Sequence, residues 1–296
     1  MADEIVVASA PEAGVAIVAG ITTQLVREAQ QRHELSPTAS AAVGRLMTGA
    51  ALLGTSLKGR ERLSIQVAGD GPLGGIVADV MLLPEDTIGV RGYAKHPRVN
   101  PPLNDVGKLA VGLAVGAGKM QVTRSYEVGQ PYVGVVPLET GEIAEDLAAY
   151  LANSQQIPSA VALGVLIGTD GVTAAGGAIG QVLPGADDRA VAELERCANA
   201  MPPVTQQISA GARAHDLLDA MAGDIPLRHH RRVNLIFACR CTREKVETAL
   251  LGLGRDELLK IASEQPETEA RCEFCRKTYV LSASDVSGLA QRLEKL

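Results

Sequence analysis

Four of the five cysteines in this chain fall in its last fifth, arranged in two close pairs. Cys239 and Cys241 form one pair, Cys272 and Cys275 form the other, and 30 residues separate the pairs. A segment of only about 60 residues with few large hydrophobic side chains needs a crosslink to hold a fold. The pattern therefore describes a small terminal unit that either binds one metal ion or makes two disulfides.

The spacing within the pairs favours a metal ion. Four thiolates suit tetrahedral zinc, in which each sulfur lies about 2.3 Å from the metal. The two-residue gap between Cys272 and Cys275 lets a turn present both sulfurs, and Cys239 and Cys241 would face the same side of an extended strand. We therefore predict that these four residues hold one zinc ion. Cys197 stands outside the pattern, and we expect it to be a buried apolar side chain.

The chain shows no pattern typical of a membrane or secretory segment. Its most apolar runs, such as 109–118 and 160–168, are shorter than the roughly 18 residues that span a bilayer. The N-terminus carries Asp3 and Glu4 and no basic residue before Arg27, unlike a signal peptide. We expect a cytoplasmic protein with no membrane partner. Disulfides are uncommon in that compartment, which further favours metal binding.

The charge balance argues against a nucleic-acid partner. The net charge of the chain is −6, and from residue 239 onward ten lysines and arginines balance ten aspartates and glutamates. Aromatic residues for stacking on bases are nearly absent from this segment. A zinc-ribbon nucleic-acid binder remains an alternative that tight, salt-dependent DNA or RNA binding would support.

Strand patterns dominate the first 183 residues. Residues 63–68 alternate in hydrophobicity, a Gly-Asp-Gly-Pro turn follows at 69–72, and 75–81 resumes, which predicts a hairpin. Further elements are expected as strands at 87–94, 120–125, 132–137 and 163–168 and as a helix at about 140–154.

One predicted helix stands out in this region. Ser36 is a suitable N-cap, Pro37 suits the first helical position, and the helix should run to about Ser56. Its side chains are apolar or small nearly all round, so the helix should be buried. We therefore expect about the first 180 residues to mix strands and helices, with this helix buried among them.

Residues 184–232 differ from the region before them. Four prolines divide the segment, and the helices expected at 187–200 and 205–222 owe their apolar content mostly to alanine. Small side chains bury little surface, and burial stabilises by roughly 25 cal/mol per Å². The segment is either ordered only while docked on something larger or a permanently folded helical connector. We expect the basic run at 228–232, which includes His229–His230, to be a solvated loop.

The terminal unit should be mixed α and β. One helix is expected between a cap at Thr242 and a stop at Gly252, a second at 256–263, and a last one after a cap at Ser284. Residues 271–281 should form a strand pair that turns through the second cysteine pair.

The zinc hypothesis leads to a redox hypothesis. Metal-bound cysteines are thiolates, and the thiolate is the form that oxidants attack. A sulfenic acid on one cysteine could be resolved to a disulfide by its near neighbour in either pair. Losing thiolates leaves the metal under-ligated, and because metal binding supplies folding free energy in such units, the unit should then unfold. A structural zinc site with no redox role is the alternative.

A thiol–disulfide oxidoreductase that uses Cys272 and Cys275 catalytically is a further alternative. No thioredoxin-like βαβ pattern surrounds this pair, and the second cysteine pair favours a shared metal. The histidines at His33, His96 and His215 have no partner pattern for catalysis. We therefore expect that the protein is not an enzyme.

A set of ordered motifs runs along the whole chain. They are Gly-Asp-Gly-Pro-Leu-Gly-Gly at 69–75, Ala-Glu-Asp-Leu at 144–147 with Tyr150, Ser-Gln-Gln-Ile-Pro-Ser-Ala at 154–160, Ala-Ala-Gly-Gly at 174–177, Leu-Pro-Gly-Ala at 183–186, and Cys-Glu-Phe-Cys at 272–275 with Tyr279. In these motifs, and in its double cysteine pair, the chain resembles the heat shock protein 33 family of redox-regulated holdase chaperones. The departures, Gln155 for an expected Glu and Thr242 for a common Ser, touch no predicted metal ligand.

The resemblance implies an α+β fold, with β-sheets around a buried helix in the N-terminal domain, and a three-part organisation of the chain. Residues 1–183 would form the N-terminal core and dimerisation domain, 184–234 a metastable helical linker, and 235–296 the zinc-binding redox-switch domain. Oxidation would form Cys239–Cys241 and Cys272–Cys275 disulfides, release the zinc, and unfold the tail and the linker. The exposed surface of the homodimer would then hold unfolding client proteins without ATP.

Overall fold

The computed structural model describes residues 2–293 and divides into two compact units. Unit 1 ends at Ala238, and unit 2 begins at Cys239. Within the described residues, no helix is both long enough and apolar enough to cross a membrane.

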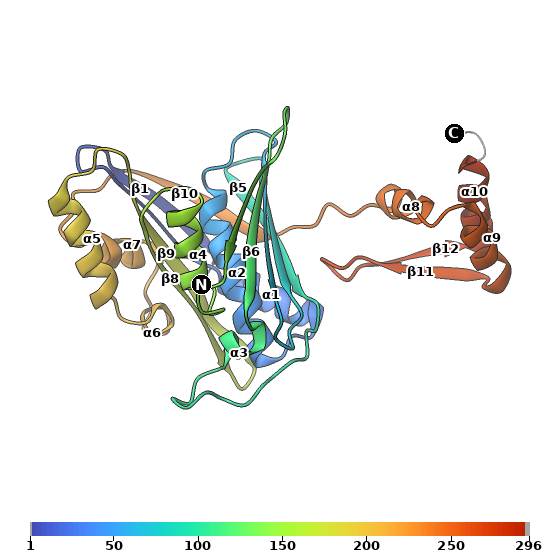
Figure 1. The fold of residues 1–296 in the computed structure, drawn as a ribbon, viewed down its shortest axis with the longest axis horizontal. Helices are drawn as coiled ribbons and strands as arrows, with labels where there is room; N and C mark the ends of the chain where they lie inside the picture. The colour runs from blue at the N-terminus through green and yellow to red at the C-terminus, as the bar shows by residue number, and fades with distance from the viewer. Residues whose placement is uncertain (1, 294–296) are drawn as a thin grey trace. The chain divides into compact units, whose positions relative to one another are not determined.

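Unit 1 combines a single large sheet with seven helices among the residues described (Figure 1). Its strands are β1 (Glu4–Ala10), β2 (Val15–Ile21), β3 (Arg62–Gly69), β4 (Ile76–Leu83), β5 (Thr87–Ala94), β6 (Gly118–Ser125), β7 (Tyr132–Pro137), β8 (Ser159–Gly168), β9 (Gly171–Val182) and β10 (Arg228–Phe237). Its helices are α1 (Thr23–His33), α2 (Pro37–Gly54), α3 (Val111–Val115), α4 (Ala144–Asn153), α5 (Asp188–Ala200), α6 (Val204–Ser209) and α7 (Ala214–Ala222).

The ten strands are ordered β7-β6-β3-β4-β5-β10-β1-β2-β9-β8. The predicted hairpin is confirmed, since β3 and β4 pair antiparallel with Leu63 opposite Val80. The predicted strands at 87–94 and 132–137 match β5 and β7 residue for residue. The sheet, the buried helix and the terminal unit described below together confirm the predicted α+β class.

Strand β10 corrects one expectation. It lies inside the sheet, antiparallel to β1 on one side and parallel to β5 on the other. The basic run at 228–232 is therefore not a loop, because backbone pairing with β1 from Arg228 to Asn234 fixes it as a strand. The exposure of Arg228, Arg231 and Arg232 to solvent nevertheless agrees with their charge.

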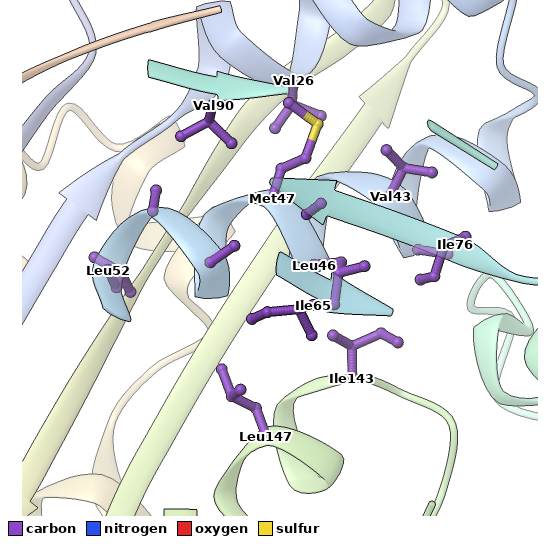
Figure 2. Close-up of a cluster of buried hydrophobic side chains, with 14 of the residues drawn as sticks. Val26, Val43, Leu46, Met47, Leu52, Ile65, Ile76, Val90, Ile143 and Leu147 are labelled. Atoms are coloured by element: carbon purple, nitrogen blue, oxygen red, sulfur yellow. The ribbon is translucent and has the colours of Figure 1, made fainter. Parts of the chain in front are cut away.

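Helix α2 forms the centre of the unit 1 core. Ser36 caps it by accepting a hydrogen bond from the Ala39 amide at 3.1 Å, and Pro37 is its first residue, as predicted. Fifteen of its 18 residues are buried, and Figure 2 shows some of them, such as Leu46 and Met47, clustered with side chains of the surrounding strands and of α4. At Gly44 a Cβ atom would lie only 2.5 Å from Cγ1 of Val26, so α1 and α2 approach too closely there for a larger residue.

Helices α5, α6 and α7 cover the sheet face opposite α2 (Figure 1). Strands β1 and β2 are buried on both faces as a result: Ile5 belongs to the α2 core, whereas Val6 packs in the cluster beneath the three helices. A continuous helix over 205–222, as expected from the sequence, is wrong. The chain turns between α6 and α7, where Gly211 has a positive φ of 100°.

Unit 2 is small and mixed. Its elements are α8 (Arg243–Leu251), α9 (Arg255–Glu264), β11 (Glu267–Arg271), β12 (Thr278–Ser282) and α10 (Ala283–Leu293). Thr242 caps α8 by accepting a hydrogen bond from the Lys245 amide at 3.3 Å, as predicted. The predicted cap at Ser284 is wrong by two residues, because the Ser282 hydroxyl accepts the bond from the Asp285 amide instead.

Candidate metal centre

The four cysteines of unit 2 meet at one point. Their sulfur atoms all lie within 4.8 Å of one another, with Cys239 and Cys272 at 3.8 Å and Cys241 and Cys275 at 3.3 Å. A metal bound tetrahedrally by sulfur at about 2.3 Å requires sulfur–sulfur distances of about 3.8 Å. The donor set and its dimensions therefore fit zinc. None of these four cysteines forms a disulfide in this structure.

The second cysteine pair sits in the tight turn between β11 and β12. The Cys272 amide donates to the Lys277 carbonyl at 3.0 Å, and Arg276 has a positive φ of 62° that closes the turn. The backbone amides of Phe274 and Cys275 donate to the Cys272 sulfur, and the Lys277 amide donates to the Cys275 sulfur. These amides point both sulfurs at the same place, which is what a metal site requires.

The first cysteine pair lies in the segment that leads into α8. The Thr242 cap fixes the chain immediately after Cys241, and Lys245 Nζ donates to the Arg240 carbonyl at 2.7 Å between the two cysteines. Local contacts of this kind set the direction of the segment, so its two sulfurs face the same centre as the β11–β12 turn.

Burial and hydrogen bonding give the thiols of Cys241, Cys272 and Cys275 different pKa values. Burial raises the pKa of the Cys241 thiol, but hydrogen bonds from Tyr279 and from the other three thiols outweigh it and lower the pKa to about 7. Burial raises the pKa of Cys275 to about 12. Burial also raises the pKa of Cys272. Of Cys241, Cys272 and Cys275, Cys241 is thus the one that most readily becomes a thiolate before any metal binds.

Tyr279 is a site residue whose role the sequence did not reveal. Its hydroxyl on β12 donates to the Cys241 carbonyl at 3.0 Å and to the Cys241 sulfur at 3.2 Å. This hydrogen bond to Cys241, together with burial, raises the pKa of Tyr279. The alternation of Tyr279 and Leu281 as buried positions on β12 is the one signal that could have indicated an inward-facing tyrosine.

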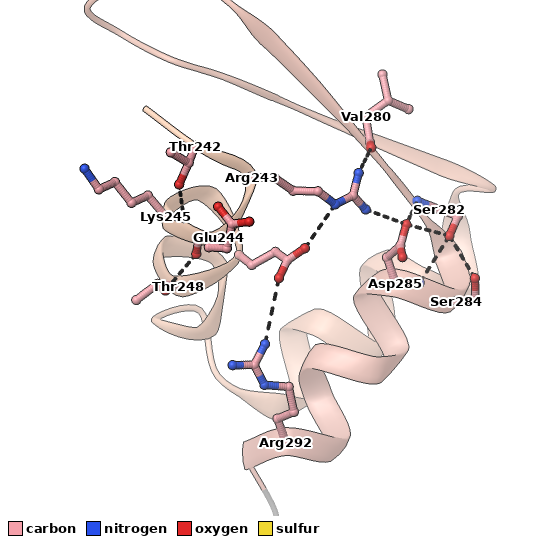
Figure 3. Close-up of polar contacts among 11 residues, drawn as sticks. Thr242, Arg243, Glu244, Lys245, Thr248, Val280, Ser282, Ser284, Asp285 and Arg292 are labelled. Carbon is pink, nitrogen blue, oxygen red and sulfur yellow. Dashed lines mark hydrogen bonds and ion pairs between the residues drawn. The ribbon is translucent and has the colours of Figure 1, made fainter. Parts of the chain in front are cut away.

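An ion-pair network ties the elements of unit 2 together (Figure 3). The Arg243 guanidinium donates to the Val280 carbonyl of β12 at 3.1 Å and to the Asp285 carboxylate of α10 at 2.8 Å. It also bonds Glu247, which pairs with Arg292 at 3.8 Å. Because Arg243 follows the first cysteine pair closely, the network holds that pair against the strand that carries Tyr279.

The other sequence candidates lie in unit 1 and form no comparable cluster among the described residues. Cys197 is buried in α5, as expected, but its surroundings are not apolar, because its sulfur lies 3.3 Å from the Arg196 guanidinium and 3.5 Å from the Glu193 carboxylate. His33 is buried and stacks on Tyr93. His215 is half exposed and lies against His230.

Comparison with known proteins decides the family. The family model described as Hsp33 protein matches residues 3–282. The chain belongs to the Hsp33 family. The family resemblance seen in the motifs is therefore confirmed.

Full-length relatives support this assignment. A 33 kDa chaperonin of Desulforamulus reducens is 40% identical over 296 residues, covering 100% of this chain and 99% of that protein. A 33 kDa chaperonin of Geobacillus kaustophilus is 39% identical over the full length of both chains. The crystal structure of the 33 kDa chaperonin, a heat shock protein 33 homolog, from Thermotoga maritima is similar with a TM-score of 0.92 and 34% identity, covering 100% of both chains.

This protein is accordingly an Hsp33-family chaperone with a four-cysteine cluster in its C-terminal unit. The Hsp33 family is a family of chaperones rather than of enzymes, which agrees with the expectation from the sequence. The four sulfurs are close enough to bind a metal ion together.

Proposed function

We propose that this chaperone is a redox-regulated, ATP-independent holdase. In the reduced state Cys239, Cys241, Cys272 and Cys275 hold one zinc ion, and the protein binds client proteins poorly. Oxidation to two disulfides removes the metal ligands and exposes a surface that binds unfolding proteins. The observation that carries the proposal is the convergence of the four sulfurs within 4.8 Å in a chain of the Hsp33 family.

Bound zinc would keep all four sulfurs as thiolates and join the two cysteine pairs. Thiolates are the species that react with peroxide. One thiolate attacks hydrogen peroxide, forming a sulfenic acid and releasing hydroxide. A second thiolate then attacks that sulfur, forming the S–S bond and releasing a second hydroxide. The two thiolates thus transfer two electrons to one peroxide molecule as each disulfide forms.

The disulfides proposed are Cys239–Cys241 and Cys272–Cys275, within the sequence pairs. The sulfur contacts of 3.3 Å and 3.8 Å instead join cysteines of different pairs. Either pairing needs the sulfurs to approach to about 2.05 Å. Mass spectrometry of peptides from the oxidised protein distinguishes the pairings, and a Cys241–Cys275 link would contradict the one proposed.

Loss of the metal ligands would unfold unit 2 and then release α5–α7. Helix α5 buries only Ala190, Leu194 and Cys197, so little apolar surface holds it in place. The strand face beneath these helices is apolar, with buried residues Val6, Ala8, Val15, Ile17, Ala19 and Ile21. Once uncovered, this face would offer unfolding client proteins a hydrophobic surface.

The remaining parts of the proposal follow the family. Residues 1–183 would form the core and dimerisation domain, 184–234 the metastable linker, and 235–296 the redox switch. The active form would be a homodimer in the cytoplasm, in a stress response to oxidation. Neither nucleic acid nor membrane is a proposed partner, since basic and acidic residues balance from residue 239 onward.

The test follows three quantities in one oxidation experiment. Reduced, zinc-loaded protein is treated with peroxide at mild heat while zinc release, free thiols and suppression of client aggregation are recorded together. The proposal expects four thiols and the zinc to be lost as aggregation suppression appears. If the zinc and the thiols are lost while suppression stays unchanged, the redox switch is wrong and a structural zinc site is the better account.

A further inference from the structure

The Tyr279 side chain joins the buried core of unit 2 to the Cys241 sulfur. The Tyr279 ring is 9% exposed and belongs to the buried cluster of unit 2, together with Leu281 and Leu258. Cys241 packs against the same cluster. The hydroxyl reaches the Cys241 sulfur at 3.2 Å, so one end of the side chain is held by the core and the other touches a proposed metal ligand.

Neighbouring contacts keep this side chain in place. Lys277 Nζ lies over the Tyr279 ring, 5.0 Å from its centroid. Arg243 bonds the carbonyl of Val280, the next residue on β12, and so fixes the strand against the start of α8. The contacts of Lys277 with the ring and of Arg243 with the strand therefore help to position the Tyr279 hydroxyl, as a support for a metal ligand requires.

The chemistry of an O–H···S bond gives the contact two effects. A donor that bonds a thiolate stabilises its negative charge, which lowers the reactivity of that sulfur toward an electrophile such as peroxide. The same bond orients the sulfur for metal binding, and partners of this kind strongly affect metal affinity in other proteins. Backbone amides serve this role at Cys272 and Cys275, but only a side-chain bond can be removed by one substitution.

We propose that Tyr279 is a positioning residue that holds Cys241 as a metal ligand and slows its oxidation, so that it sets how much oxidant the switch requires. The proposal rests on the redox function proposed above and deepens it. The competing interpretation is that Tyr279 only fills the core, and that its hydroxyl proton serves the Cys241 carbonyl, 3.0 Å away, rather than the sulfur.

The experiment compares the full-length protein with Tyr279→Phe, which keeps the ring and removes the hydroxyl. Tyr132→Phe is the matched control, because it removes a hydroxyl that bonds Ser154 in unit 1. Three quantities are measured: zinc affinity by chelator competition, the rate of zinc release in hydrogen peroxide, and the sulfur-to-metal charge-transfer band of the cobalt-substituted protein. Thermal unfolding of each zinc-loaded form is recorded beside them.

Tyr279→Phe is expected to weaken zinc binding about 10-fold or more and to speed peroxide-driven release at least about three-fold. The cobalt charge-transfer band should move to lower energy, because a thiolate without its hydrogen bond donates electrons more easily. Tyr132→Phe should match the wild type in all three measurements.

An unmoved cobalt band overturns the proposal, even if zinc binding weakens, because destabilisation of the core alone would not change the electronic state of a bound sulfur. Equal release rates for Tyr279→Phe and wild type overturn it as well. If the wild-type protein releases zinc on oxidation but gains no chaperone activity, the redox function fails while the role of Tyr279 stands. The two claims are thus separable.

Discussion

The two units of this molecule are stabilised in different ways. Unit 1 surrounds the 18-residue helix α2 with strands and has an extensive core that includes Leu46, Met47 and Ile65. The buried cluster of unit 2 contains only Leu258, Tyr279, Leu281, Val286, Leu289 and Ala290 among its described residues. Unit 1 can be stable through burial alone, whereas unit 2 has too little buried apolar surface to do without a crosslink.

The helices α5–α7 lie between these extremes. They belong to unit 1 and bury Leu194, Leu217 and Met221 against its sheet, and three of the nine residues that they bury are alanines. Their packing partner is the sheet, and without it they would be short isolated helices of marginal stability. The comparison teaches that stability decreases from α2 to α5–α7 to unit 2, and that a switch can use the two weaker parts while the strongest part stays folded.

The largest expected effect is removal of the metal. Metal binding supplies about 10–16 kcal/mol in small zinc units, so a strong chelator should unfold unit 2 of the reduced protein and leave α2 and its strands folded. Limited trypsin digestion checks this, with cleavage expected after the basic residues of 239–293 and resistance in the sheet. Readdition of zinc should restore resistance. If unit 2 still resisted trypsin without metal, it would be stable without a crosslink, and the two units would not differ in how they are stabilised.

The next effect is a cavity in the unit 1 core. Leu46 is fully buried, so Leu46→Ala should lower the free energy of unfolding of unit 1 by about 2–5 kcal/mol, measured by urea denaturation. Leu103, which is 59% exposed, gives the control variant Leu103→Ala with little change. Leu281→Ala in unit 2 should instead weaken zinc binding and leave the unfolding transition of the α2 core unchanged. A lowered transition of the α2 core in Leu281→Ala would show that this core also depends on unit 2.

A smaller effect compares two helix caps. Ser36 and Thr242 each accept a backbone hydrogen bond at the start of a helix, and replacement of either by alanine should cost about 1 kcal/mol. In Ser36→Ala the loss should appear as lower stability of unit 1 in urea. In Thr242→Ala it should appear as about five-fold weaker zinc binding, because 1.4 kcal/mol corresponds to a factor of ten. Unaltered zinc affinity in Thr242→Ala would argue that unit 2 folds without the metal.

The smallest effect concerns the docking of α5. Arg196 donates to Glu193, and with the Asp224 amide it lowers the pKa of Glu193 from 4.5 to about 2. Because the folded pKa is the lower one, this stabilisation is present above about pH 4.5 and is lost as the pH falls toward 2. NMR signals of α5 should therefore broaden or shift in this range before those of α2. Glu193→Gln should abolish this pH-dependent change in the α5 signals. If the α5 signals of the variant changed with pH as those of the wild type do, the role of Glu193 would be contradicted.

Part of the fold could be predicted because its signals are local. The alternation in β3, the turn at 69–72 and the Ser36–Pro37 start of α2 are all visible within short windows of sequence. Strands β1 and β2 were not predicted, since burial on both faces removes the alternation. Strand β10 was mistaken for a loop because its conformation depends on pairing with β1, more than 200 residues earlier in the chain.

In the candidate site, too, local features could be predicted from the sequence and contacts between distant residues could not. Cysteine spacing predicted that the four thiols share one place, because each pair is brought together by local geometry and the fold joins the pairs. The role of Tyr279 could not be predicted, because its hydroxyl meets Cys241 only after β11 and β12 pair and α8 is fixed by Arg243. Which disulfides form, and where the linker begins and ends, stay predictions.

The central claim is that oxidation of the four cysteines unfolds the weaker parts of the molecule and spares the strongest. Hydrogen exchange of the full-length protein, measured by mass spectrometry before and after treatment with peroxide at mild heat, tests it directly. The account predicts that β11, β12 and α8–α10 lose protection, that α5–α7 lose it as well, and that α2 keeps it. Retained protection in unit 2 after loss of four thiols, or equal loss of protection in α2, would contradict the account.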